Sequence, residues 1–168
     1  MTKVRSVICS IVVVAAAPVS WALVLFPGSW ETLRWLVLPT GATGLLLFLT
    51  ALLSVVADRG NRSLPLGEQV QALRDHPLLG LGTLVCFAAL SVATVRGFSG
   101  PGAPVEELGI RYFDDHGVRT LATAEQWMRA HAWLFIFGCA FGAMGAYTAR
   151  SLFDVLDRQL RSRPSAAA

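Results

Sequence analysis

Charged side chains are scarce in this sequence, and four long stretches lack them entirely. Only 15% of the 168 residues are charged and 54% are hydrophobic, whereas soluble domains carry about 25% charged residues. The uncharged stretches cover Val7–Phe26, Leu36–Val56, Leu78–Val95 and Ala132–Ala149. A helix needs about 20 apolar residues to cross the ~30 Å core of a bilayer. The sequence therefore predicts an all-α fold, a four-helix transmembrane bundle that forms a single membrane domain over residues 1–168.

Other absences restrict the function. The three cysteines, Cys9, Cys86 and Cys139, all lie inside the uncharged stretches, so no disulfide framework is expected outside the membrane. No motif for catalysis, metal or nucleotides stands out, and the basic residues do not cluster with aromatics as in nucleic-acid-binding proteins. Ion and proton pathways usually contain charged residues within the spans, and these spans have none. We expect a non-enzymatic protein without a cofactor or a nucleic-acid partner.

The first stretch has some features of a secretory signal peptide. Lys3 and Arg5 precede an apolar run, and the small residues at 15–17 resemble a cleavage site. However, Pro18 would follow the cut, and apolar residues continue to Phe26. We therefore expect this stretch to remain as a membrane helix.

Charge and tryptophan distribution predict the orientation. With the N-terminus inside the cell, nine basic residues fall on inner segments and five on outer ones, which satisfies the positive-inside rule. The same topology places all five tryptophans, residues with a preference for membrane interfaces, at one interface; they are Trp21, Trp30, Trp35, Trp127 and Trp133. The single lysine among 14 basic residues is typical of a GC-rich coding sequence. We predict a multi-pass protein of a bacterial cytoplasmic membrane, with both termini in the cytoplasm.

Small residues mark positions for close helix packing. Gly138 and Gly142 form a GxxxG step in the fourth stretch, and Gly41 and Gly44 follow Pro39 in the second. One interpretation is that Pro39–Gly44 breaks the second helix to line a transport site. The interpretation we favour is a tolerated kink whose glycines permit a close helix contact. The partner of the GxxxG step, in this chain or another, stays open.

Two further segments have helical patterns on the inner side. Leu66, Val70 and Leu73 predict a short amphipathic helix at the inner interface. Beyond the fourth stretch, Asp154 and Arg158 have the spacing of a solvated ion pair on one helix.

The outer loop, residues 97–129, is the one extramembrane segment with a clear internal pattern. Its first part, Gly97–Pro104, reads as irregular, whereas Ile110–Phe113 and Val118–Leu121 predict a β-hairpin closed by the turn residues Asp114–Gly117. Thr123 and Gln126 then have the spacing of a capping box that begins a helix. An isolated hairpin is marginal in water, so this one must pack on the bundle or on another chain. Its expected packing surface consists of Tyr112, Phe113 and Trp127.

This loop resembles the last loop of uncharacterised bacterial four-helix integral membrane proteins. The resemblance rests on Tyr112–Gly117, Thr120, Thr123–Gln126 and His131–Trp133, which correspond to an aromatic pair, a polar His-Gly turn, a capped acidic helix, and a His and Trp at the start of the last span. The present turn is one residue shorter and has two Asp where Asn is usual. The resemblance implies the topology and no function.

The candidate partner-binding residues come from this loop; they are Tyr112, Phe113, Asp114, Asp115, His116, Trp127 and His131. The preferred hypothesis is a membrane interaction protein, either an accessory subunit or a recognition or immunity-type factor that binds another membrane protein or a second copy of itself. The first alternative is a carrier or channel subunit that uses Pro39–Gly44. The second is a haem- or quinone-linked redox subunit that uses His131, an ionisable residue at the membrane edge. Asp114, Asp115 and His116 could ligate a metal, although consecutive turn residues rarely converge on one ion.

Overall fold

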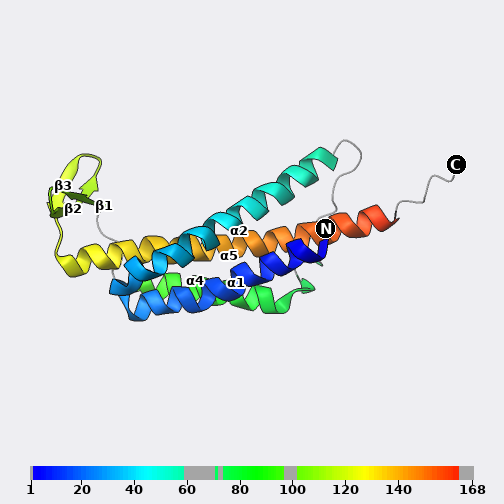
Figure 1. Cartoon of the computed structure of the whole chain (residues 1–168), viewed down its shortest axis with the longest axis horizontal. Coiled ribbons are helices and arrows are strands. Elements are labelled where there is room, and N and C mark those ends of the chain that lie inside the picture. The colour runs from blue at the N-terminus through cyan, green and yellow to red at the C-terminus, as the bar shows by residue number, and fades with distance from the viewer. Residues whose placement is uncertain (1, 59–70, 72–73, 97–101, 163–168) are drawn as a thin grey trace.

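Four long helices pack together, and a small sheet stands at one end of them (Figure 1). The computed structural model describes residues 2–58, 71, 74–96 and 102–162. The helices are α1 (Thr2–Leu25), α2 (Trp30–Asp58), α4 (Pro77–Val95) and α5 (Ala124–Ser162). Each is long and apolar enough to cross a membrane. The predicted four-helix membrane bundle is therefore confirmed, and the chain is a multi-pass membrane protein.

The helices extend beyond the uncharged stretches that predicted them. α2 begins at Trp30, ahead of the uncharged stretch, because the first turn of a membrane helix can contain charged residues. Only η1 (Pro27–Ser29), a short 3-10 turn, separates it from α1. The last part of the predicted outer loop is likewise helical, because α5 begins at Ala124. The Thr123 amide donates to Oε1 of Gln126 (3.0 Å), and the Gln126 amide donates to Oγ1 of Thr123 (3.2 Å). These two bonds confirm the predicted capping box.

The sheet is a three-stranded antiparallel meander, ordered β1-β2-β3, formed by β1 (Ala103–Glu107), β2 (Ile110–Asp115) and β3 (Val118–Leu121). The two predicted strands are present. The prediction that 97–104 is irregular is wrong at its end, because Ala103 and Pro104 belong to β1. Pro104 obscured this strand in the sequence, since proline cannot donate to a ladder and is tolerated only where its missing amide faces away from the pairing.

Both tight turns of the meander have left-handed backbone. Leu108 and Gly109 have φ of 52° and 77°, and His116 and Gly117 have 51° and 91°. Two consecutive residues with positive φ form the turn whose twist matches that of a hairpin. The predicted turn at Asp114–Gly117 is thus present, and the turn ending at Gly109 adds the unexpected strand.

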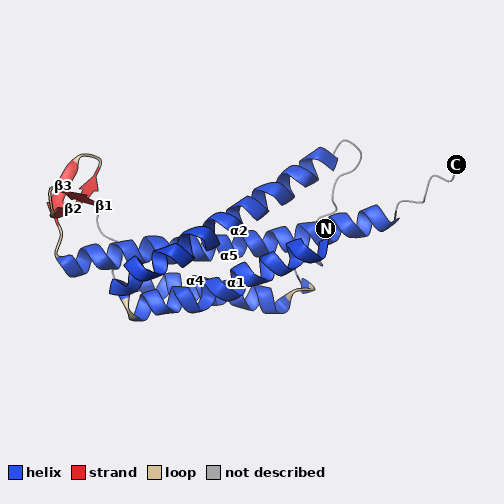
Figure 2. Ribbon diagram, in the orientation of Figure 1, coloured by secondary structure: helices blue, strands red, loops and turns tan. Residues whose placement is uncertain are grey.

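α5 is the central helix and contacts each of the other three (Figure 2). Its buried face consists largely of small side chains, which allow neighbouring backbones to approach; they include Ala132, Cys139, Ala140, Ala143, Ala146 and Ala149. Cys9 and Cys86 are also fully buried. The predicted amphipathic helix at Leu66, Val70 and Leu73 lies outside the described residues.

Candidate functional site

The glycines of α2 and α5 meet each other within this chain. A Cβ atom on Gly44 would lie 2.1 Å from the carbonyl oxygen of Gly142, and one on Gly142 would lie 2.8 Å from Cα of Gly41. A Cβ on Gly41 would lie 3.2 Å from the carbonyl oxygen of Gly138. The two backbones are therefore in direct contact, which identifies α2 as the partner of the GxxxG step. The helix α2 is continuous from Trp30 to Asp58, so the break that would support a transport site is not there.

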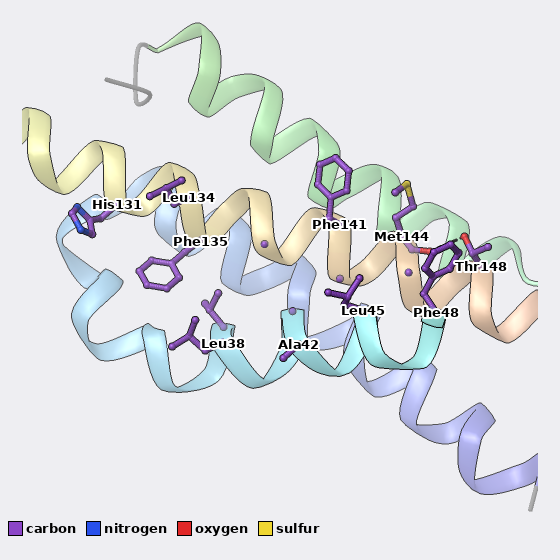
Figure 3. Close-up of a pocket in the computed structure, with 15 residues that line it drawn as sticks. Leu38, Ala42, Leu45, Phe48, His131, Leu134, Phe135, Phe141, Met144 and Thr148 are labelled. Atoms are coloured by element: carbon purple, nitrogen blue, oxygen red, sulfur yellow. Dashed lines mark hydrogen bonds between the residues drawn. The ribbon is translucent and has the colours of Figure 1, made fainter. Parts of the chain in front are cut away.

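A groove of about 630 Å³ runs alongside this helix crossing. Figure 3 shows residues of its walls, among them Leu38 and Leu45 on α2 and Phe135 and Phe141 on α5. The lining is apolar except for His131 at one end and Thr148 at the other. The Thr148 hydroxyl is already satisfied, because it donates to the carbonyl of Met144 (2.9 Å).

His131 closes the groove as part of an aromatic cluster, defined here as Trp30, Trp127, His131 and Phe135. The His131 ring lies 3.8 Å from the Trp127 ring and 4.7 Å from the Trp30 ring, centroid to centroid, and Trp30 stacks on Phe135 at 5.8 Å. Nδ1 of His131 lies 3.0 Å from the carbonyl oxygen of Trp127. The cluster joins the beginnings of α2 and α5, and so fixes the orientation of the imidazole.

The sheet packs on this cluster through one of its faces. Side chains alternate between faces along a strand, so Arg111 and Phe113 share one face while Ile110 and Tyr112 share the other. The Arg111 guanidinium lies 4.6 Å above the Trp127 ring, and Phe113 is buried. The Ala122 amide also donates to the Arg111 carbonyl (3.0 Å), which ties the strand to the start of α5. The expectation that the sheet leans on the bundle agrees with these contacts.

Three of the candidate partner-binding residues are buried within the chain. Tyr112, Phe113 and Trp127 are 5%, 3% and 7% exposed. They support the sheet and present little surface of their own. The indole Nε1 of Trp127 is buried without a hydrogen-bond partner among the described residues.

The opposite face of the sheet contains a shallow hollow of about 250 Å³, which we call the sheet hollow. It is lined by Glu107, Leu108, Ile110, Tyr112, Arg119 and Leu121. Leu121 is the cross-strand partner of Tyr112, and Ile110 that of Glu107, which places them on one face. Leu108, Leu121 and Ile110 are 102%, 78% and 55% exposed. Sequence patterning missed this surface because Leu108 and Glu107 belong to the unpredicted hairpin.

Charged groups surround Tyr112 in the sheet hollow. The Arg119 guanidinium lies 4.5 Å above its ring, and Arg119 Nη1 donates to Glu107 Oε2 (3.0 Å). Burial, followed by the nearby Glu107 carboxylate, raises the pKa of Tyr112. The Tyr112 hydroxyl and then Arg119 lower the pKa of Glu107. The hydroxyl is nevertheless buried without a hydrogen bond of good geometry to a described residue, so it retains capacity for a further partner.

The polar turn residues have mainly local roles. The Asp114 carboxylate accepts from the Gly117 amide (2.8 Å), which is the bond that stabilises a tight turn. Asp115 and His116 are exposed, with 3.8 Å between Asp115 Oδ1 and His116 Nε2. Within the described residues, no group of three or more His, Cys, Asp or Glu side chains has the arrangement of a metal site.

The three histidines lie in three separate places. His116 is in the β2–β3 turn and His131 is in the aromatic cluster, whereas His76 lies before α4 and contacts Asp154 of α5, with 2.5 Å between Nε2 and Oδ2. Because no two of them share a site, the chain does not bring two histidines together as axial haem ligands.

The contact of His76 with Asp154 belongs to a polar cluster that sequence analysis missed. Arg150 Nη1 donates to Asp154 Oδ1 (2.6 Å), and Arg158 pairs with Asp75, which lowers the pKa of Asp75. The sequence suggested a local pair of Asp154 with Arg158, whereas the tertiary structure adds partners that lie before α4. The two contacts join residues that are separated by 78 and 83 positions in the sequence, so no local pattern could have revealed them.

Comparison with known proteins adds no relative to this description. The chain matches no protein-family model, no curated protein and no solved structure among those searched. The geometry of this chain therefore carries the functional argument.

Proposed function

We propose that this multi-pass membrane protein is a non-enzymatic recognition or accessory subunit that binds another membrane protein through its sheet. The sheet hollow is the observation that carries the proposal. Exposed Leu108, Ile110 and Leu121 surround the buried Tyr112 hydroxyl at one face of a small sheet. Contiguous apolar side chains beside a few polar groups are typical of surfaces that bind other proteins.

The partner we propose presents an extended segment with an apolar side chain. The side chain enters the sheet hollow, and its backbone lies along β3, which is an edge of the described sheet. An unpaired edge strand offers amide and carbonyl groups to another chain. Glu107 and Arg119 at the rim select a partner with both donors and acceptors.

The test compares two neighbouring residues of β3. Leu121→Glu places a charge in the sheet hollow, whereas Thr120→Glu places the same charge on the other face of the same strand. We expect Leu121→Glu to remove specific proteins from material purified in mild detergent, as quantified by mass spectrometry, while Thr120→Glu retains them. The same protein set from both variants and from wild type would refute the proposal.

The same proposal includes a bacterial cytoplasmic membrane with both termini in the cytoplasm. The His116 side chain is 99% exposed at the sheet end of the bundle, and the three native cysteines are buried. A membrane-impermeant maleimide should therefore label His116→Cys in intact cells. Arg74→Cys, exposed at the other end, should react only after lysis. The reverse pattern would invert the orientation.

A further inference from the structure

The groove between α2 and α5 contains an unusual polar position. Among its described lining residues, Thr148 is satisfied within its own helix, but His131 has only one ring nitrogen engaged. A backbone carbonyl can only accept, so Nδ1 of His131 carries the proton that it donates to Trp127. In the neutral ring, Nε2 is then a hydrogen-bond acceptor. The aromatic cluster holds this acceptor at the end of an apolar groove.

The groove has the dimensions of one long chain. The lining of α5 runs from His131 to Thr148, which is roughly 25 Å at 1.5 Å per residue. An ordinary lipid tail reaches only half of the ~30 Å core, about 15 Å. Distributed along its length, the volume of 630 Å³ gives a cross-section of roughly 25 Å². Carbon atoms pack at about 4 Å, so this section accommodates a single hydrocarbon chain.

The groove is also open at the position where a chain would lie. A Cβ atom on Gly138 would meet no atom within 4 Å, although Gly138 lines the groove. A Cβ atom on the nearby Gly44 or Gly142, by contrast, would collide with backbone atoms of the facing helix. The groove is therefore open at Gly138, whereas the glycines at 44 and 142 lie in the contact between the two helices.

We infer that the groove binds a membrane alcohol with a single apolar chain longer than one leaflet, such as a polyprenyl alcohol. Its hydroxyl donates to Nε2 of His131, and its chain lies along the groove toward Thr148. The buried and unpartnered indole Nε1 of Trp127, whose ring contacts His131, shows that this cluster has more hydrogen-bonding capacity than the described chain satisfies. A hydroxyl can both donate and accept. This site is separate from the sheet hollow and does not depend on the proposed function.

The test uses fluorescence, because Trp30 and Trp127 lie beside His131. The full chain in nanodiscs of one defined phospholipid is titrated with three probes that carry a nitroxide quencher near the polar end. The first is a polyprenyl alcohol long enough to fill the groove, the second is its methyl ether, and the third is an alcohol whose chain is half as long. The ether retains the chain but has no donor for His131.

For wild type, we expect about ten-fold tighter binding of the long alcohol than of its ether, which corresponds to about 1.4 kcal/mol for one hydrogen bond. The short alcohol should bind more weakly than the long one. His131→Phe should bind alcohol and ether equally, and His131→Gln, which offers an amide oxygen, should restore part of the preference. Equal binding of alcohol and ether by wild type, or an intact preference in His131→Phe, would overturn the inference.

A second pair of variants tests the groove itself. Gly138→Leu extends a side chain from a position where a Cβ atom meets open space, and it should weaken both long probes at least ten-fold. Val14→Leu enlarges an exposed side chain on α1, away from the groove, and should leave binding unchanged. Circular dichroism and gel filtration establish that the variants are folded. Unchanged binding in Gly138→Leu would show that the probes bind elsewhere and would also overturn the inference.

Discussion

The helices α1 and α2 are alike in hydropathy and differ in how much of each is buried. Their spans have mean hydropathies of 2.4 and 2.0, yet 44% of the α1 span is buried inside the protein, against 17% of the α2 span. α1 packs along its length, from Cys9 to Leu23. α2 touches α5 closely at its glycines and then diverges from the bundle, as Figure 1 shows. Hydropathy thus decides whether a segment enters the membrane, and the size of its side chains decides whether it packs there.

The far ends of the helices extend this comparison. At the end away from the sheet, Arg5 of α1 lies 5.0 Å above the Phe153 ring of α5, and His76 before α4 contacts Asp154. The corresponding part of α2 exposes Leu49, Leu52 and Leu53. α2 is therefore held mainly at its start, where Trp30 joins the aromatic cluster, and at its glycines, whereas α1 and α4 also have contacts at the far end. The following variants test that difference.

The largest effect is expected at the glycine contact. Gly44→Ala would place a methyl group 2.1 Å from the Gly142 carbonyl oxygen, so the helices must separate. We expect a loss of about 3 kcal/mol in the free energy of unfolding, measured in mixed micelles by circular dichroism, because overpacking against backbone cannot relax by rotamer change. Gly138→Ala is the control, since it meets open space, and it should be neutral or slightly stabilising. Similar losses in both would show that the contact does not hold α2.

A smaller effect is expected in the packed core of α1. Leu23 is fully buried, so Leu23→Ala leaves a cavity that should cost about 2 kcal/mol. The estimate is below that for a soluble core, because lipid is as apolar as the protein interior and only the packing loss remains. Leu46→Ala on α2, where the side chain is 62% exposed, should cost less than about 0.5 kcal/mol. Equal costs would contradict the contrast between the two helices.

The polar cluster around Asp154 should contribute less to the free energy of unfolding than the packing of Leu23. Asp154→Ala removes the acceptor of His76 and of Arg150, whose side chains are about one-fifth exposed, and we expect a loss of roughly 1 kcal/mol. Amide hydrogen exchange at the start of α4 should become faster, because the contact between His76 and Asp154 that joins this end of α4 to α5 would be lost. Asp157→Ala, three residues further along the same helix, should change neither measurement.

The smallest effect is a dependence on acid. The hydrogen bond from Arg158 lowers the pKa of Asp75 below its ordinary value of 3.8. A carboxylate whose folded pKa is depressed stabilises the protein above its unfolded pKa, and this contribution disappears as the pH falls through the folded pKa. Exchange at the start of α4 should therefore rise below about pH 3.8, and Asp75→Asn should abolish that dependence. An unchanged acid dependence in Asp75→Asn would assign it to another carboxylate.

Much of the architecture could be predicted because its causes are local in the sequence. Uncharged stretches predicted the spans, and Thr123 with Gln126 predicted the start of α5. The turn at Asp114–Gly117 was likewise visible. The strand β1 could not be predicted, because Pro104 disfavours a strand in the local sequence. Its strand conformation depends on pairing with β2.

The candidate site was predicted less well. Tyr112, Phe113 and Trp127 are buried, as expected of a packing surface, but as partner-binding candidates they present little surface. The Tyr112 ring is covered by Arg119 on the face of the sheet away from α5, which a sequence pattern could not reveal. His131 was recognised as an ionisable residue at the membrane edge, while its groove depends on α2 crossing α5 and then leaving it. The sheet hollow needed the β1–β2 hairpin to bring Leu108 and Glu107 beside Leu121.

By itself, the sequence determined that this chain enters a membrane with four helices and carries a polar, turn-rich segment before the last. The energy of transferring apolar residues into lipid is a sum over neighbours along the chain, so it can be read from composition. Only the tertiary structure decided which glycines meet, where the groove opens and which nitrogen of His131 is free. Those features depend on shape and on contacts between residues far apart in sequence, and lipid offers no hydrophobic gain that would favour one helix pairing over another.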